Sequence, residues 1–259
     1  MGGMDDSLMS DRIEIIAIHV PQTIREGDDI GSILVDSCRR SNIELKDGDI
    51  IVVASKIVSK AEGRLVMLDK VVPHQFAINS SKVVRKDPRE IEAILSASKR
   101  VVKMRRGLLL TESTVGVVGA NSGADKSNIG IENALLLLPE NPDASARKIR
   151  KTIKKLTGVD VAVIISDTYG RAWREGQVDM AIGASGIKVF RDYRGKPDMY
   201  NRTLKVTLIA QADELSSAAE LVMGKSRGVP AAIIRGYKYE VAEESARKLN
   251  RRDSKDLFR

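Results

Sequence analysis

The chain has 259 residues, of which 42% are hydrophobic and 30% charged, and this is enough for one large or two smaller domains. Its net charge of +8 favours acidic partners such as nucleic acids, anionic membranes or polyanionic small molecules. One cysteine and two histidines exclude an internal disulfide, a cysteine-based zinc site and histidine-rich metal chemistry. No apolar run approaches the roughly 20 residues of a membrane span. The polar start predicts a disordered tail over 1–11 of a cytoplasmic protein.

The first half of the chain predicts a mixture of strands and helices. One helix starts near Asp29. Another starts with Asp87 as its N-cap and Pro88 as its first residue, and Glu90 completes a capping box. The predicted strands are 12–20, the buried run that ends at Ser55, 100–105, 107–111 and 114–118.

The segment "DASARKIRKTIKKLTG" predicts a basic helix over 143–157. Asp143 suits its N-cap, and Gly158 suits the position just past its last residue. Its apolar residues form one stripe at helical spacing, made of Ala146, Ile149, Ile153 and Leu156. We interpret the lysines and arginines off this stripe as a solvated face. A nucleic-acid helix lacks support, because aromatic residues that stack on single strands make up only 3% of the chain.

The rest of the chain continues the irregular order of elements. The predicted strands are 159–166, 203–210 and 229–236, and the predicted helices are 211–224 and a frayed tail over 240–259. There is no clean β–α–β alternation, internal repeat, low-complexity block or linker. We therefore predict an α+β fold, irregular in its mixture of elements, with a single domain over 12–259.

Two carboxylates are candidates for a cation site. Asp125 is the one acid of "GANSGADKSN" (119–128), whose glycines, serines and asparagines predict a loop. It is either a solvated turn acid or a ligand. Asp167 follows the predicted strand 159–166, at the position where open sheets place ligand-binding groups. Asp167 alone could cap a turn, but with Thr168 it supplies the oxygens that a hard divalent cation prefers.

Basic residues and one aromatic ring accompany these acids. Arg171 and Arg174 offer forked donors for a phosphate or carboxylate of a substrate. Lys56 and Lys60 follow a buried strand, so they either reach phosphates or are ordinary surface lysines. Trp173, the only tryptophan, either packs within its loop or stacks on a flat heterocycle.

The tripeptide Gly-Lys-Ser at 224–226 does not belong to a P-loop. Ala219 stands where that motif requires its first glycine, and the segment runs from a helix to a strand rather than the reverse. The chain also lacks a G-x-G-x-x-G motif. A bound nucleotide therefore requires another architecture.

Four segments in this order resemble one family, the coenzyme F420:L-glutamate ligases. They are "VVASKIVSKAEGR", "NSGADKSN", "ISDTYGRAWREG…AIGASGI" and "LVMGKSRGVP". The resemblance extends over nearly the whole chain, from "IREGDDI" to "VPAAIIRG". It implies a mixed α/β fold that forms an intertwined homodimer. It also implies an enzyme that adds L-glutamate, through γ-linked amide bonds, to the side chain of a deazaflavin coenzyme precursor.

The resemblance implies cofactors and site residues as well. Enzymes of this family convert GTP to GDP and phosphate and need Mg²⁺ or Mn²⁺, as two ions, often with K⁺. By position, the metal ligands match Asp125, Asp167 and Thr168. The GTP contacts match Pro21, Gln22, Thr23, Ile24, Ser55, Lys56, Lys60, Asn128, Met223, Gly224, Lys225, Ser226, Arg227, Gly228 and Val229.

Lys225 departs from the family pattern. Archaeal relatives often carry Gln or Glu there, and that residue is a metal ligand in them. An ammonium offers only donors and cannot bind a cation. The loop that contains Lys225 is also about one residue shorter than in those relatives. Either one metal is lost or differently held, or Lys225 contacts phosphate directly; the number of metals and the nucleotide preference stay open.

The expected chemistry runs through an acyl phosphate. A carboxylate attacks the γ-phosphate of GTP, and the amine of glutamate then displaces phosphate, so positioning and charge neutralisation dominate. No general base stands out in the sequence. The alternatives are a γ-glutamyl ligase for another carboxylated cofactor such as a folate, a basic nucleic-acid-binding module, and a catalytically inactive paralogue. We expect no nucleic-acid or membrane partner.

Overall fold

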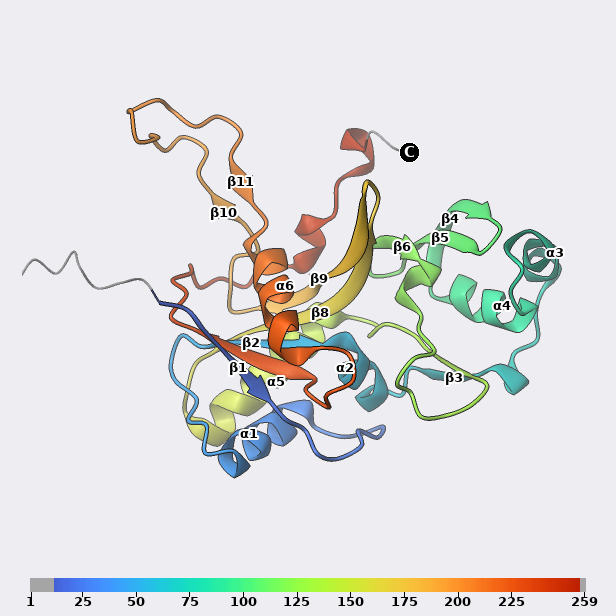
Figure 1. Ribbon diagram of the computed structural model, residues 1–259, viewed down its shortest axis with the longest axis horizontal. Helices are drawn as coiled ribbons and strands as arrows, with labels where there is room; N and C mark the ends of the chain where they lie inside the picture. Colours follow the sequence, from blue (N-terminus) through green and yellow to red (C-terminus); the bar gives the residue numbers. More distant parts are fainter. Residues whose placement is uncertain (1–11, 257–259) are drawn as a thin grey trace, which may run out of the picture.

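The computed structural model describes residues 12–256 and centres on a five-stranded sheet (Figure 1). In order across the sheet, the strands are β1 (Glu14–Ile18), β12 (Ala231–Arg235), β2 (Ile50–Ala54), β8 (Ala162–Arg171) and β9 (Arg174–Ser185). β2 and β8 are parallel, and every other neighbouring pair is antiparallel. The sheet is therefore mixed, in line with the predicted α+β class.

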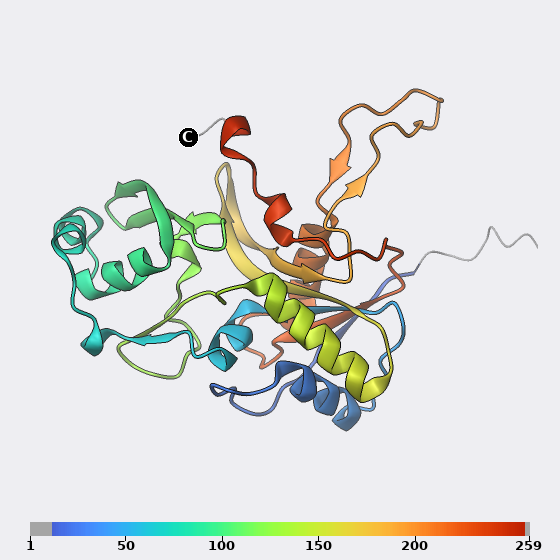
Figure 2. The same ribbon diagram turned by 180° about the vertical axis from the view of Figure 1, so that it is seen from behind.

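Helices cover both faces of this sheet (Figures 1 and 2). α1 (Ile30–Arg40) and α5 (Pro142–Thr157) pack on one face, and α6 (Gln211–Met223) packs on the other. Successive side chains of β2 point to opposite faces, so Ile51 contributes to the core under α1 and α5 while Ile50 contributes to the core under α6. Burial on both sides explains why β2, the first half of β8 and most of β12 are continuous apolar runs rather than alternating ones.

A smaller lobe lies beside the sheet (Figure 1). Its elements are β3 (Leu65–Met67), α3 (Gln75–Val84), α4 (Pro88–Ser96), β4 (Ser98–Arg105), β5 (Leu108–Ser113), β6 (Val118–Ala120) and β7 (Ala134–Leu136). It has a core of its own around Ile91, Ile94 and Leu109. The lobe meets the sheet where Gly119 lies against the ring of Tyr169, and α2 (Ser55–Ala61) follows directly from β2 on the same side.

An extended arm projects from the other end of the molecule (Figures 1 and 2). It is built on the short pair β10 (Arg191–Asp192) and β11 (Leu208–Ile209). Its outer part exposes Met199, Tyr200 and Val206. The predicted strand over 203–210 is mostly wrong, because most of this segment runs along the arm and only its end pairs with another strand.

Two predicted helix starts are confirmed, and a third is wrong. The Asp29 carboxylate accepts a hydrogen bond from the Ser32 backbone N–H, and Asp87 caps α4 ahead of Pro88. In α5, however, Asn141 is the N-cap, and Asp143 lies inside the first turn.

The side chain of Asp143 is buried. It accepts hydrogen bonds from the backbone N–H groups of Ala184 and Ala246 and so fastens the C-terminal segment to the sheet. That tail forms short 3-10 turns, η4 (Ala246–Leu249) and η5 (Asp253–Lys255), rather than the predicted helix. Long-range hydrogen bonds to Asp143, which local periodicity cannot reveal, hold part of it in place.

Other differences are local. Glu90 bonds Lys86 and Lys126 rather than closing a capping box. The strand predicted at 114–118 starts only at Val118, and Leu156, assigned to the apolar stripe of α5, is 40% exposed. Among residues 12–256, no helix is both long and apolar enough to cross a bilayer. The predicted tail at 1–11 lies outside the described residues.

Candidate active site

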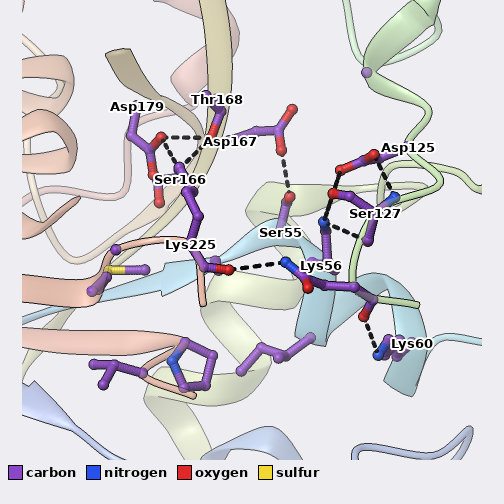
Figure 3. A pocket seen from close by; sticks show the side chains of 18 of the residues that line it. Ser55, Lys56, Lys60, Asp125, Ser127, Ser166, Asp167, Thr168, Asp179 and Lys225 are labelled. Carbon is purple, nitrogen blue, oxygen red and sulfur yellow. Dashed lines mark hydrogen bonds and ion pairs between the residues drawn. The ribbon is translucent and has the colours of Figure 1, made fainter. Parts of the chain in front are cut away.

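A pocket of about 730 Å³ opens where β2, β8, the lobe and the loop after α6 meet (Figure 3). All three predicted metal ligands line it, and so do all predicted GTP contacts except Pro21 and Arg227. The fold thus unites segments that are more than one hundred residues apart in the sequence. The prediction that Asp125 and Asp167 share one cleft is confirmed.

The first turn of α2 organises one side of the pocket. Ser55 is its first residue and donates a hydrogen bond to the Asp167 Oδ1 atom at 2.7 Å. The Lys56 Nζ atom donates to Asp125 Oδ2 at 2.7 Å, and Lys60 Nζ donates to the carbonyl oxygen of Asn128 at 2.9 Å. The two lysines are one helical turn apart, so both face the loop that carries Asp125.

The Asp125 loop is shaped by residues that tolerate left-handed backbone. Asn121, Ser122 and Asn128 all have positive φ angles, as small polar residues can in tight turns. Burial pushes the pKa of the Asp125 carboxyl upward, but hydrogen bonds from Lys56 and Ser127 outweigh it, so the pKa is lowered. Asp125 is therefore a stable carboxylate that already has a counter-charge.

Asp167 has the opposite electrostatic setting. Burial raises the pKa of its carboxyl to about 6, and the negative charges of Asp179 and Asp125 add to the rise, although the Ser55 hydrogen bond works against it. Within residues 12–256, its side-chain partner is the Ser55 hydroxyl rather than a lysine or arginine. A cation bound beside Asp167 would stabilise its ionised form and lower its pKa.

Asp179 is a site residue that the sequence analysis missed. It lies on β9, opposite Thr168 in the β8–β9 register, and is only 4% exposed. The Thr168 hydroxyl donates to Asp179 Oδ1 at 2.6 Å. Lys225 Nζ reaches the same pair, 2.6 Å from Thr168 Oγ1 and 2.9 Å from Asp179 Oδ1. The available signal was an acid placed directly before the apolar run "MAIGAS", which β9 shares with the sheet core.

Comparison with known proteins assigns the chain to a family. The family model described as F420-0:Gamma-glutamyl ligase matches residues 18–236. The chain is 43% identical to the coenzyme F420:L-glutamate ligase of Methanopyrus kandleri over 252 residues, which cover 95% of this chain and 98% of that protein. The protein of the same name from Methanocaldococcus jannaschii is 42% identical over 250 residues, with 96% and 97% covered. The chain belongs to the F420-0:gamma-glutamyl ligase family. Membership makes it an amide-forming ligase.

The pocket of this family member contains a buried hydroxyl without a partner. Ser166 Oγ belongs to a lining residue and has no hydrogen-bond partner in the described part of the chain. Burial raises the pKa of the Tyr169 hydroxyl well above its usual value, with the Asp167 charge adding to it. Buried polar groups are normally satisfied. The unpaired Ser166 hydroxyl is available to a polar ligand.

The donor set fits a metal that is shared with phosphate. The described residues contain no cluster of three or more acidic, histidine or cysteine side chains that could hold an ion alone. Asp125 and Asp167 nevertheless line one pocket, and Mg²⁺ is commonly held by one or two carboxylates together with substrate phosphates and water. Lys56 and Lys60 donate hydrogen bonds to the loop that carries Asp125, at the carbonyl oxygens of Ser127 and Asn128.

The tip of the β8–β9 hairpin, residues 171–176, does not line this pocket. β8 continues to Arg171 rather than ending before Asp167, and Arg174 starts β9, a strand that the sequence analysis did not predict. Arg171 donates to the backbone carbonyl oxygens of Glu175 and Gly176, and neither arginine lines the pocket. Trp173, at the hairpin tip, is 78% exposed. The structure confirms neither interpretation of Trp173, because its side chain is largely exposed and does not line the pocket.

Proposed function

We propose that this chain is a GTP-dependent ligase that adds L-glutamate to the F420-0 precursor through γ-linked amide bonds, giving products with one and two glutamates. The observation that carries the proposal is the partly buried Asp167 carboxylate, which lines a large pocket together with Asp125 and has no cationic partner among the described residues. The printed names of the relatives support the choice of substrate.

The reaction needs activation of a carboxylate, since an oxide is a poor leaving group. In the proposed route, an oxygen of the precursor's terminal carboxylate bonds to the γ-phosphorus of GTP, and the bond from that phosphorus to the bridging oxygen of GDP breaks. The amine of glutamate then attacks the acyl carbon, phosphate leaves, and a proton passes from the amine to water. Positioning and charge neutralisation supply most of the rate enhancement in such steps.

Different residues of the pocket would contact the phosphates, the metal ion and the rest of the nucleotide. Lys56 and Lys60 stand beside the Asp125 loop and offer donors to phosphate oxygens. Asp125 and Asp167 would hold Mg²⁺ or Mn²⁺, which when bound neutralises phosphate charge and orients the transferred group. The backbone at Gln22–Ile24 and the loop from Met223 to Val229 line the rest of the pocket and would contact the nucleotide. K⁺ is part of the proposal, without an assigned ligand.

The proposal includes a homodimer in the cytoplasm. Its support is the arm, which exposes Met199, Tyr200 and Val206 at 95%, 84% and 85%. Apolar side chains gathered on a projecting segment favour coverage by another chain. Light scattering at micromolar concentration tests this, and a monomer would contradict it.

The decisive experiment is incubation of the protein with F420-0, GTP, Mn²⁺ and L-glutamate, followed by mass spectrometry. We expect mass increments of one and two glutamates, equimolar release of GDP, and a strongly reduced yield with the Asp167→Asn variant. A folded protein that leaves F420-0 unchanged contradicts the proposal. Parallel reactions with a folate and with ATP then distinguish another γ-glutamyl ligase or another nucleotide from an inactive protein.

A further inference from the structure

We propose that the ammonium of Lys225 takes the place of a second divalent cation, so that this chain holds one metal with its nucleotide instead of two. This rests on the proposed function, because the metal between Asp125 and Asp167 is completed by nucleotide phosphates. It concerns the opposite side of the same pocket, where Thr168 and Asp179 face each other across β8 and β9 (Figure 3).

The Lys225 ammonium already occupies the position between the Thr168 and Asp179 oxygens. Lys225 Nζ lies 2.6 Å from Thr168 Oγ1, 2.9 Å from Asp179 Oδ1 and 3.7 Å from Glu220 Oε1. A Mg²⁺ ion sharing these oxygens would lie at about 2.1 Å from each. It would then almost coincide with the ammonium, which offers no lone pair to it. Thr168, one of the predicted metal ligands, therefore binds Lys225 instead.

The burial of Asp179 explains why the Lys225 ammonium remains beside it. The side chain of Asp179 is only 5% exposed, and Lys225 is its ion-pair partner. A buried carboxylate left without a cation is strongly unfavourable. Asp167 differs, since its partner is the Ser55 hydroxyl. The pocket thus has one carboxylate that still requires a cation and one that the chain has already neutralised.

The backbone around Lys225 keeps the side chain in position. Gly224 ends α6 with a φ of 59°, and this turn directs the next residue back toward the sheet. The Asn128 side-chain amide donates to the carbonyl oxygen of Lys225 at 2.9 Å. Because Asn128 belongs to the loop of Asp125, the ammonium is positioned relative to both sides of the pocket. It is set to act as a fixed positive charge toward bound phosphates.

The test measures bound Mn²⁺ per bound nucleotide, by equilibrium dialysis with a non-hydrolysable GTP analogue followed by elemental analysis. The wild-type chain should bind one Mn²⁺ per nucleotide. Lys225→Gln, which supplies an amide oxygen in place of the ammonium, should bind two. Lys225→Met, which supplies neither charge nor ligand, should keep one Mn²⁺ and bind the analogue at least about 10-fold more weakly, a change of ~1.4 kcal/mol. Lys151→Gln, on an exposed position of α5, is the matched control and should behave as wild type.

The outcomes separate the two proposals. Two Mn²⁺ per nucleotide in the wild-type chain, or one in a folded Lys225→Gln variant that retains nucleotide, overturns the inference and leaves the ligase proposal standing. Absence of nucleotide binding by the wild-type chain overturns both. Glutamate incorporation is measured on the same preparation, so the ligase proposal receives its own result. Thermal unfolding of each variant confirms that the metal count refers to folded protein.

Discussion

The pocket has two walls, and their carboxylates differ in solvent exposure. The sheet wall, made of Asp167, Thr168 and Asp179 on β8 and β9, buries Asp179 and partly buries Asp167, whereas the loop wall around Asp125 leaves 46% of that side chain exposed. The exposure of the lysines that pair with these acids follows the opposite order. Lys56, which pairs with the exposed Asp125, is 25% exposed, and Lys225, which pairs with the 5% exposed Asp179, is 55% exposed.

This difference indicates which wall needs a cation more. On the loop wall, water and Lys56 both stabilise the charge, so the pKa of Asp125 is lowered despite its partial burial. On the sheet wall, burial and the neighbouring acids raise the pKa of Asp167. A cation bound between the walls should therefore gain more free energy from Asp167 than from Asp125.

The largest expected effect is on catalysis. Asp167→Asn should lower the rate of glutamylation by about 10³-fold, equivalent to ~4 kcal/mol in the activation barrier, because an amide cannot neutralise the cation. Asp125→Asn should lower it by about 10²-fold, since water can replace a ligand on an exposed wall. The measurement is kcat with GTP, Mn²⁺, precursor and glutamate at saturation, with circular dichroism to confirm folding. Equal losses in the two variants would contradict the asymmetry.

The second prediction concerns stability against pH in metal-free protein. The folded pKa of Asp167 is raised to about 6 from 3.8, so its contribution to stability is complete at low pH and is lost as the pH rises through about 6. Relative to wild type, Asp167→Asn should therefore become more stable between about pH 4 and pH 7, by on the order of 2 kcal/mol.

The loop wall should show the reverse trend. The folded pKa of Asp125 is lowered, so its contribution is present above the ordinary carboxyl pKa and is lost as the pH falls through the folded value. Asp125→Asn should be less stable than wild type near neutral pH, and this deficit should shrink in acid. Urea unfolding in EDTA at a series of pH values measures both. Parallel curves for the two variants would show that the walls do not differ.

The sequence predicted most of the sheet core because its strands are continuous apolar runs. The strand before Asp167 and the run at 229–236 were recognisable for that reason, and Asp29 and Asp87 marked helix starts through local capping. β9 was missed, since its first half is polar and exposed at the hairpin and carries no apolar pattern. Contacts between distant segments, such as those of Asp143 with the C-terminal tail, have no local signal.

The site residues also differ in whether a local sequence pattern marks them. Asp125 was noticed as the one acid in a loop of small residues, and Asp167 and Thr168 because they follow an apolar run, although β8 continues through both of them. Asp179 was not, because its role depends on the β8–β9 register and on Lys225, which lies 46 positions away in the sequence. The departure at Lys225 was visible as a chemical mismatch, but its partners became identifiable only when the fold brought them together.

A third prediction alters the contact between the walls. A Cβ atom added at Gly119 would lie 2.8 Å from the Tyr169 ring, so Gly119→Ala must push β6 and the Asp125 loop away from β8. We expect a loss of about 1–2 kcal/mol in stability, typical of overpacking, and a higher KM for GTP. Gly170→Ala is the control for stability, because no atom lies within 4 Å of its added Cβ. Gly119→Ala with unchanged stability and KM would show that the walls move independently.

The smallest effect is expected at Trp173. This side chain is 78% exposed in the turn between β8 and β9, and it does not line the pocket although Asp167 lies on the adjoining strand β8. Titration with GTP and Mn²⁺ should therefore leave its fluorescence emission unchanged. A Trp173→Phe, Ser226→Trp double variant supplies the comparison, because Ser226 is exposed and lines the pocket, so its indole should respond to nucleotide. Quenching of Trp173 itself by GTP would mean that the hairpin closes over the sheet wall. In that case, Arg171 and Arg174 would return as contacts to substrate, and the pocket described by Asp167 and Asp179 would be only the open form of the site.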